Sequence, residues 1–395
     1  MKILKKSHRQ SGVKKIAVVT GTRAEYGILK PLLKKIKASA KLDLKLIVTG
    51  MHLLKKYGSA INDIKKDGFK IDSEIPMYAI VQDGSYYGQA LARGINGLTL
   101  ALSKMKPDIL VVLGDRLESL AAALAAATLR IPIAHIHGGD KTDSGHIDEN
   151  IRHAITRFAN LHFAATDGHR RRLLKMGEEP RRVFRVGALG LDSIINEPAI
   201  KKEILFKKLG LDPMQKLIIS LFHPVHLEAA QMGREAREIV AALKELKIQT
   251  VVLYPNNDLG SQAIIEEIEK VKEFPFIKIF KNIPHEEYVS LLRYAKVLIG
   301  NSSSGILEAP AMKLAAVNIG SRNVGREHGE NVIFIKARKA EIIKAVKKVF
   351  DDKNFQKKIQ KSWNPYGDGK TSNRIVKVLE KVKIDKNLLR KKIIY

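Results

Sequence analysis

Two series of short apolar runs, separated by longer amphipathic segments, dominate this sequence. Each run has the length of a strand, and its nearly continuous apolar character is typical of strands that helices cover on both faces. The first series comprises KIAVVTG (15–21), LDLKLIVTG (42–50), DILVVLGD (108–115), IPIAHIHGG (131–139) and LHFAAT (161–166). The second comprises KLIISLF (216–222), IQTVVLY (248–254), FIKIF (276–280), KVLIG (296–300) and LAAVNIG (314–320). The pattern therefore predicts an α/β protein with two doubly wound, Rossmann-like domains.

The text between the runs predicts the helices and the domain limits. Amphipathic segments indicate helices near 26–37, 86–105, 117–129 and 148–159. A Gly/Pro-containing stretch, GALGLDSIINEPAIKK, separates the two series and is interpreted as a hinge. The expected parts are a basic tail at 1–14, an N-terminal domain at 15–190, a C-terminal domain at 191–368, and a C-terminal helix within 369–395 that packs back on the N-terminal domain. We expect the two domains to face a cleft, with ligands at the carboxyl ends of the strands.

Composition excludes several classes of protein. The 395 residues include no cysteine, so neither disulfides nor thiolate metal sites can contribute. The longest apolar stretch, LAAALAAATL at 120–129, is too short and too rich in alanine to span a membrane. The first residues, MKILKKSHRQSGVKK, lack the apolar centre of a signal peptide. We therefore expect a soluble, cytoplasmic protein without an integral membrane segment.

The charge balance is strongly basic. With 70 Lys and Arg against 41 Asp and Glu, the formal net charge is +29, which raises the question of a nucleic-acid partner. The lysines are spread along nearly every predicted helix, and the 6% of aromatic residues are not interleaved with them as a stacking platform requires. We therefore expect no nucleic-acid partner, but a solvated basic surface that attracts anionic ligands or membranes.

The segment GNSSSGILEAP at 300–310 follows a predicted strand and begins a helix. A turn of small residues at this place exposes backbone N–H groups, and serine hydroxyls add further donors, so a phosphate fits well. Glu308, about one turn into the helix, could bind a vicinal diol such as a ribose. The alternative is a capped helix, with Ser302 or Ser303 as N-cap and the glutamate as its capping-box partner.

Polar residues also follow the strands of the first series. Arg23 lies near a helix N-terminus after the first strand, where it could meet a phosphate or simply be exposed. Asp115, in GDRLES, stands at a strand end and could act in chemistry or cap the next helix.

The segment HIHGGDKTDSGHIDENIRHAI at 135–155 holds four histidines and four carboxylates, too many for a core element. His135, His137, Asp140 and His153 are all possible metal ligands, but no zinc-motif spacing is present, so we expect no metal. Acid–base chemistry by carboxylates in a cleft is the preferred interpretation. Asp148 is spaced to pair with Arg152 as i, i+4 on the predicted helix.

Three loops of the second series carry further candidates. His223 follows a strand and precedes Pro224, which puts it at the edge of the sheet where ligands bind, or in an ordinary loop. The turn in KNIPHEEY (281–288) has exposed backbone that could pair with the edge of a flat heterocycle. The polar loop SRNVGREHGENV (321–332) carries two arginines and is suited to closing over an anion.

Six motifs resemble those of a known family in the same order. They are TGTRAEYGILKP, GDRLES, HIHGGDKT with IDENIRHAIT, the His-Pro pair after KLIISLF, GNSSSGILEAP and GSRNVGREHGENV. From about residue 15 to about residue 375, the chain resembles the hydrolysing UDP-N-acetylglucosamine 2-epimerases of sialic-acid and related nonulosonic-acid synthesis. The resemblance implies a GT-B fold and the reaction of UDP-N-acetylglucosamine and water to N-acetylmannosamine and UDP, without a metal or other cofactor.

The resemblance also implies roles for individual residues. By motif position it assigns catalytic carboxylates to Asp115 and Asp148 and a histidine to His223. The expected substrate-binding residues are Arg23, Arg116, Asn282, Ser302, Ser303, Gly305, Glu308 and Arg322. The serines would hold the diphosphate, the glutamate the ribose, and the turn at Asn282 the uracil edge. UDP would leave C1 as the C2 proton is removed, giving a glycal-type alkene to which water adds with inversion at C2.

One departure concerns the third acid of the family. Part of the family has a catalytic glutamate where His137 stands here, and other hydrolysing members have the acid at the position of Asp140. One extra residue also precedes IDEN. Either side chain could therefore complete the site.

The substrate and the reaction type have alternatives. A UDP-2,4-diacetamido or GDP-linked sugar, a non-hydrolysing 2-epimerase, a GT-B glycosyltransferase and a nucleotide-sugar-binding protein without turnover all fit the architecture. The acids at Asp115 and Asp148 argue against a binder without turnover, and the HGG form with the GREHGEN loop favours hydrolysis. We expect a homo-oligomer, either a dimer or a tetramer.

Overall fold

The computed structural model describes residues 12–54, 60–78, 85–141, 147–256 and 260–394. Most of the predicted basic tail at 1–14 and part of the segment 135–155 lie outside these ranges. The described residues divide into two compact units. Unit 1 contains residues up to 193 together with 369–394, and unit 2 contains 194–368. The division falls within helix α7 (Gly190–Asn196).

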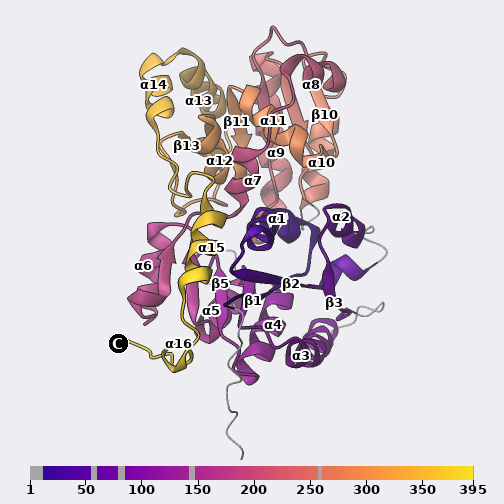
Figure 1. The fold of residues 1–395 in the computed structure, drawn as a ribbon. Helices are drawn as coiled ribbons and strands as arrows, with labels where there is room; N and C mark the ends of the chain where they lie inside the picture. Colours follow the sequence, from indigo (N-terminus) through magenta and orange to yellow (C-terminus); the bar gives the residue numbers. More distant parts are fainter. Residues whose placement is uncertain (1–11, 55–59, 79–84, 142–146, 257–259, 395) are drawn as a thin grey trace, which may run out of the picture. The chain divides into compact units, whose positions relative to one another are not determined.

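Unit 1 contains a seven-stranded parallel sheet within the described residues, in the order β3-β2-β1-β4-β5-β6-β7. The strands are β1 (Lys14–Thr20), β2 (Leu42–Thr49), β3 (Ile71–Ile75), β4 (Ile109–Leu113), β5 (Ile133–Ile136), β6 (Leu161–Ala164) and β7 (Val183–Arg185). Its helices are α1 (Arg23–Ala38), α2 (Ala60–Lys66), α3 (Tyr86–Met105), α4 (Leu117–Thr128), α5 (Ile147–Phe158), α6 (Asp167–Lys175), α15 (Thr371–Lys381) and α16 (Lys386–Leu389), with short 3₁₀ turns η1 (Gly50–Leu53) and η3 (Pro180–Arg182) (Figure 1).

Alternating side chains of the strands build a core on each face of this sheet. Ile16 and Val18 of β1 pack in the core that includes Ile375 of α15, whereas Ala17 and Val19 pack in the opposite core. This is why the strand is apolar throughout instead of alternating with polar residues. The C-terminal helix α15 therefore belongs to unit 1, where it also packs on α1.

Unit 2 contains a six-stranded parallel sheet within the described residues, in the order β10-β9-β8-β11-β12-β13. The strands are β8 (Ile218–Leu221), β9 (Thr250–Leu253), β10 (Ile277–Phe280), β11 (Val297–Gly300), β12 (Ala315–Ile319) and β13 (Val332–Ile335). Its helices are α8 (Lys202–Leu209), α9 (Met232–Leu246), α10 (Ser261–Glu269), α11 (His285–Tyr294), α12 (Ser304–Leu307), α13 (Lys339–Asp351) and α14 (Lys353–Lys361), with η4 (His226–Gln231) and η5 (Ala309–Met312) (Figure 1).

The strand register brings the ends of neighbouring strands together at one edge of each sheet. In unit 1, Val18 pairs with Val111 and Leu113 pairs with Ile136, so the residues after β4 and β5 are adjacent. In unit 2, Gly300 of β11 pairs with Leu221 of β8. Side chains that are far apart in sequence therefore meet beyond the carboxyl ends of the strands.

The apolar-run pattern misses three strands, and all three lie at sheet edges. The strands are β3, β7 and β13. β3 reads IDSEI and β7 has only three residues, so neither shows an apolar run. Edge strands are partly exposed and need less apolar sequence, which explains the miss of β3 and β7 but not of β13, which reads VIFI.

Candidate active site

The turn after β5 is shaped by two glycines. Gly139 has a positive φ of 77°, and a Cβ there would lie 2.5 Å from the carbonyl oxygen of His169. A Cβ at Gly138 would lie 2.9 Å from Nδ1 of His135. Only glycine fits both places, and Arg172 donates a hydrogen bond to the carbonyl of Gly139. The HGG sequence thus forms a tight turn that ends at Asp140.

Arg152 gathers the acidic residues around this turn. Its side chain, on α5, is only 5% exposed. The guanidinium makes ion pairs with the carboxylates of Asp115, after β4, and of Glu149. It also donates a 3.3 Å hydrogen bond to the carbonyl oxygen of Asp140. The arginine therefore compensates the charge of Asp115 and fixes its orientation.

Asp148 begins the same helix and lies near a second cation. The predicted partner of this residue on the helix is Arg152, but the contacts described for that arginine join it to Asp115 and Glu149. Burial lowers the pKa of Arg116, but Glu118, Tyr78 and Asp148 raise it, and the net result is a raised pKa. Asp148 therefore acts on Arg116. Arg116 lies directly after Asp115 and forms the N-cap of α4.

His137 and Asp140 differ in what they can offer chemically. Nε2 of His137 accepts a 3.1 Å hydrogen bond from the backbone N–H of Leu189, so the neutral ring carries its proton on Nδ1. Burial lowers the pKa of His137 to about 4, and His169 adds to the effect. Asp140 keeps its carboxylate near Arg152, and its Oδ1 lies 3.2 Å from Nε2 of His169.

His135 and His153, the other described histidines of this segment, have structural contacts. Nε2 of His135 lies 2.7 Å from the carbonyl oxygen of Gly114, and burial lowers its pKa to about 3. His153 contacts Glu149 at 3.0 Å. Within the part of the chain that the structure describes, no group of three or more His, Cys, Asp or Glu side chains is arranged to hold a metal ion.

Arg23 is the most exposed of the predicted site residues in unit 1. It begins α1, whose N-cap Thr22 accepts a hydrogen bond from the N–H of Glu25. Its side chain is 78% exposed and lies 3.4 Å from Asp63. Its assignment to phosphate binding remains a prediction.

In unit 2, Asn301 clamps the loop that carries His223. Asn301 Oδ1 accepts a 2.6 Å hydrogen bond from the His223 N–H, and its Nδ2 donates to the His223 carbonyl at 2.8 Å. Nδ1 of His223 accepts from the N–H of Asn256 at 3.2 Å. The strand-end histidine and the serine loop are thus held together across neighbouring strands.

Two residues of the loop after β12 brace the serine loop from the other side. Arg322 donates to the carbonyl oxygen of Asn301 at 3.1 Å. Asn323, which is buried, donates to the same oxygen at 2.9 Å and to Asn318 at 2.8 Å. Asn301 and Asn323 were not among the predicted residues, although an asparagine recurs in both loops, GNSSSG and SRNVG.

The capping-box interpretation of GNSSSG is wrong. Ser303 is the N-cap of α12, but its side chain makes no capping hydrogen bond. The helix has four residues, Ser304–Leu307, and Glu308 is its C-cap. The 3₁₀ turn that follows begins at Ala309 and contains Pro310. The backbone N–H of Ser304 instead approaches the hydroxyl of Ser302 at 3.3 Å. The Ser302 hydroxyl thus accepts from the first N–H of α12, whereas the side chain of the N-cap Ser303 makes no capping bond.

Glu308 carries an acceptor without a partner. Its Oε2 is buried and has no hydrogen-bond partner among the described residues. Burial raises the pKa of Glu308, while the Ser304 hydroxyl lowers it in part. Burial also raises the pKa of the neighbouring Tyr288, and the charge of Glu308 adds to this effect. A buried free acceptor is expected where a ligand hydroxyl donates.

The remaining predicted residues of unit 2 define the surroundings of the loop. Asn282 is exposed and precedes the buried Ile283 after β10. Gly305 lies where a Cβ would be 3.1 Å from that of Ala316, so the loop packs closely on β12.

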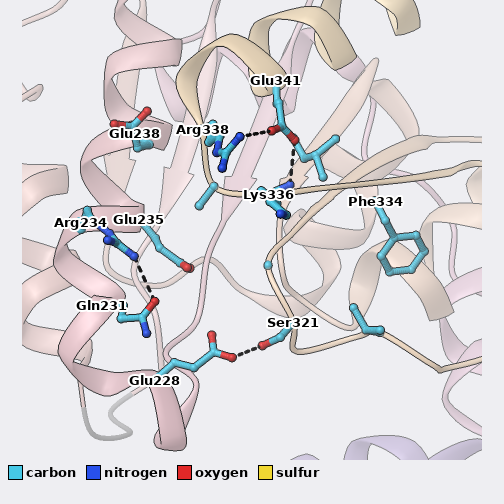
Figure 2. Close-up of a pocket in the computed structure, with 14 residues that line it drawn as sticks. Glu228, Gln231, Arg234, Glu235, Glu238, Ser321, Phe334, Lys336, Arg338 and Glu341 are labelled. Atoms are coloured by element: carbon cyan, nitrogen blue, oxygen red, sulfur yellow. Dashed lines mark hydrogen bonds and ion pairs between the residues drawn. The ribbon is translucent and has the colours of Figure 1, made fainter.

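A separate cavity of about 980 Å³ lies in unit 2 between α9 and the end of β13 (Figure 2). None of the predicted site residues lines it. Its charged walls interact with one another: Ser321 donates to Glu228 at 2.5 Å, and Arg338 lies 3.6 Å from Glu341. Four glutamates and three cationic side chains line the cavity, so it has no strong surplus of either charge to select a ligand.

Taken unit by unit, a parallel sheet with acid–base groups at its carboxyl edge and another with a Ser-rich loop there are typical of enzymes that act on phosphate-bearing ligands. No helix of the described residues is long and apolar enough to cross a membrane.

Comparisons with known proteins define the family. The chain matches the family model described as UDP-N-acetylglucosamine 2-epimerase over residues 34–380. It is 37% identical over 379 residues to a UDP-N,N'-diacetylbacillosamine 2-epimerase (hydrolyzing) of Legionella pneumophila, covering 96% of this chain and 99% of the relative. It is 35% identical over 322 residues to a UDP-N-acetylglucosamine 2-epimerase of Neisseria meningitidis, covering 81% and 83%.

A solved structure confirms the fold. The UDP-GlcNAc 2-epimerase from Neisseria meningitidis bound to UDP-GlcNAc aligns with a TM-score of 0.76 at 20% identity, covering 93% of this chain and 100% of that one. The chain therefore belongs to the UDP-N-acetylglucosamine 2-epimerase family, and the resemblance seen in its motifs is confirmed.

Proposed function

We propose that the protein is a hydrolysing 2-epimerase that converts a UDP-linked 2-acetamido sugar and water to the free 2-epimeric sugar and UDP. The observation that carries this proposal is the buried Arg152, which pairs with the carboxylates of Asp115 and Glu149 and donates to the backbone carbonyl oxygen of Asp140. Removal of the C2 proton and its return on the other face require carboxylates that are held in place.

Asp115 and Asp148 share the acid–base work in this proposal. Asp115 is the member that Arg152 orients, which suits a base that must approach C2 in one direction. Asp148 lies in the first turn of α5 and helps to raise the pKa of Arg116. A place beside this cation suits a group that exchanges protons next to a bound anion. Asp140 is the better third acid, because Nε2 of His137 is already occupied by the N–H of Leu189.

Unit 2 binds the nucleotide in this proposal. Ser302 and Ser303 would receive the diphosphate, aided by the positive charge of Arg322. The free Oε2 of Glu308 would accept a hydrogen bond from a ribose hydroxyl. His223, which Asn301 holds beside the serine loop, would contact or protonate the leaving diphosphate. Asn282 would meet the uracil edge, and Arg23 and Arg116 would add positive charge.

Two UDP-sugars are candidate substrates. UDP-N-acetylglucosamine, giving N-acetylmannosamine, follows from the family description and from the relative in Neisseria meningitidis. A UDP-2,4-diacetamido sugar is favoured by the 37% identity to the Legionella pneumophila enzyme, which is named for UDP-N,N'-diacetylbacillosamine and described as hydrolyzing.

The test is turnover of both nucleotide sugars. Purified protein is incubated with each sugar, without added metal, and free UDP and free sugar are separated by chromatography. We expect equal amounts of UDP and free 2-epimer from one of the two, and none with Asp115→Asn. UDP-linked epimer without free UDP would replace the proposal with a non-hydrolysing reaction.

A further inference from the structure

Two glutamates outside the predicted site are buried side by side at the carboxyl edge of the unit 1 sheet. Glu25, in α1, is 7% exposed, and Glu118, in α4, is fully buried. Each follows a strand, β1 or β4, whose ends are neighbours in the sheet. Two buried carboxylates so placed cannot both be charged without a large cost in free energy.

Glycines make room for the second of these carboxylates. A Cβ at Gly21 would lie 2.6 Å from Cγ of Glu118, and a Cβ at Gly50 would lie 2.5 Å from its Oε1. Gly50 also has a positive φ of 63°. Both loops, after β1 and β2, are therefore closed directly over the Glu118 side chain. If the Glu118 carboxylate had no role, two loops would not need glycine at the positions that pack against it.

The two carboxylate oxygens of Glu118 have different surroundings. Its Oε1 accepts a 3.1 Å hydrogen bond from the hydroxyl of Tyr78, and its Oε2 lies 3.6 Å from Nε of Arg116. This Oε2 is buried and has no hydrogen-bond partner among the described residues. Glu118 thus has a cation beside it and one free acceptor oxygen.

The surroundings of Glu25 favour its neutral form. Oε2 of Glu25 accepts a 2.7 Å hydrogen bond from the N–H of Gly21, the same residue against which Glu118 packs. Burial raises the pKa of Glu25 to about 8, and Glu118 adds to this, while Arg116 and the backbone N–H groups of Gly21 and Thr22 lower it.

The remaining titratable group near the end of β1 does not supply a counter-charge. His52 of η1 lies 3.1 Å from the hydroxyl of Thr20, and burial lowers its pKa to about 4. It is therefore neutral at physiological pH. Arg116 is the cation that faces the two glutamates. Asp148 also helps to raise the pKa of Arg116.

We propose that Glu25 and Glu118 share one proton, and that the negative charge they retain, held on Glu118, positions Arg116. The proton stays on Glu25, whose carboxyl lies against Gly21, so no proton leaves the pair at neutral pH. Glu118 is then a positioning residue for the substrate cation Arg116. This inference rests on the proposed function only in the role given to Arg116.

The first test does not depend on activity. Thermal midpoints of the full-length protein, Glu25→Gln and the control Glu267→Gln are compared at pH 5.5 and pH 8.5. Glu267 is also a buried glutamate, but it is paired with Arg237 and Lys270, which counter burial and lower its pKa. We expect wild type and the control to lose several degrees more than Glu25→Gln over this interval, because glutamine has no proton to lose. Equal losses in all three proteins would refute the shared proton.

The second test measures the positioning of Arg116 by steady-state kinetics at pH 7. We expect Glu118→Gln to raise KM for the UDP-sugar at least tenfold with a smaller effect on kcat, and Glu118→Asp to recover part of the loss. Glu25→Gln, which mimics the neutral acid, should raise KM less than threefold. Equal KM values for the two glutamine variants would refute the positioning role. If wild type turns over neither sugar, the proposed function fails, whereas the thermal test still decides on the shared proton.

Discussion

Arg152→Met provides the sharpest perturbation of the acidic group in unit 1. The substitution keeps most of the apolar stem but removes a guanidinium that contacts two carboxylates and one carbonyl oxygen. Removing one partner of a fully buried ion pair costs about 3–5 kcal/mol. The side chains of Asp115 and Glu149 are 27% and 22% exposed, so water compensates part of this. We expect a loss of about 2–3 kcal/mol in the free energy of unfolding.

The assay is urea denaturation, with Arg152→Lys as the matched control. Lysine keeps the charge but cannot bind two carboxylates as a planar fork, so it should recover about half of the stability and little of the activity. In kinetics, Arg152→Met should lower kcat at least a hundredfold, because Asp115 loses the group that orients it. A methionine variant that unfolds within about 0.5 kcal/mol of wild type and keeps its kcat would refute this reasoning.

Three further predictions concern other groups. Asp115→Asn should lower kcat by a factor of about 10²–10⁴, as expected for a lost general base, while UDP affinity by calorimetry stays within twofold. Glu308→Gln should weaken UDP binding about tenfold and leave the affinity for pyrophosphate unchanged, and equal losses for both ligands would contradict the ribose assignment. Burial raises the pKa of Glu25 from 4.5 to about 8, so its contribution to folding is favourable below pH 4.5 and is lost as the pH rises to 8. The loss is on the order of 5 kcal/mol, which urea denaturation across this interval should find in wild type and not in Glu25→Gln.

Much of the fold follows from the sequence, because buried parallel strands must be apolar on both faces. The helix predicted at 86–105 coincides with α3 (Tyr86–Met105), and the run at 276–280 contains β10 (Ile277–Phe280). The edge strand β3 cannot be recognised as an apolar run, because its residues Asp72, Ser73 and Glu74 are polar and are exposed or partly exposed to water. Local sequence thus predicts central strands better than edges.

The site follows only in part. The strand-end rule points to Asp115, His137 and Asp140, and the strands that they follow, β4 and β5, are neighbours in the sheet. Their roles stay predictions. The contacts of Arg152 do not follow, since helical spacing suggests Asp148 as partner, whereas sheet register brings Asp115. The sequence does not identify Glu25 as a special residue, because Thr22 and Glu25 have the spacing of an ordinary capping box. Only the packed structure shows that Glu118 lies near Glu25.

The most direct test of the account is proton NMR of the reaction in D₂O, with the UDP-sugar that the protein turns over and no added metal. The account predicts a free sugar of inverted configuration at C2, with deuterium at C2, appearing at the same rate as UDP. Free sugar that keeps its C2 proton and configuration would contradict it, because hydrolysis would then occur without the carboxylates removing a proton from C2.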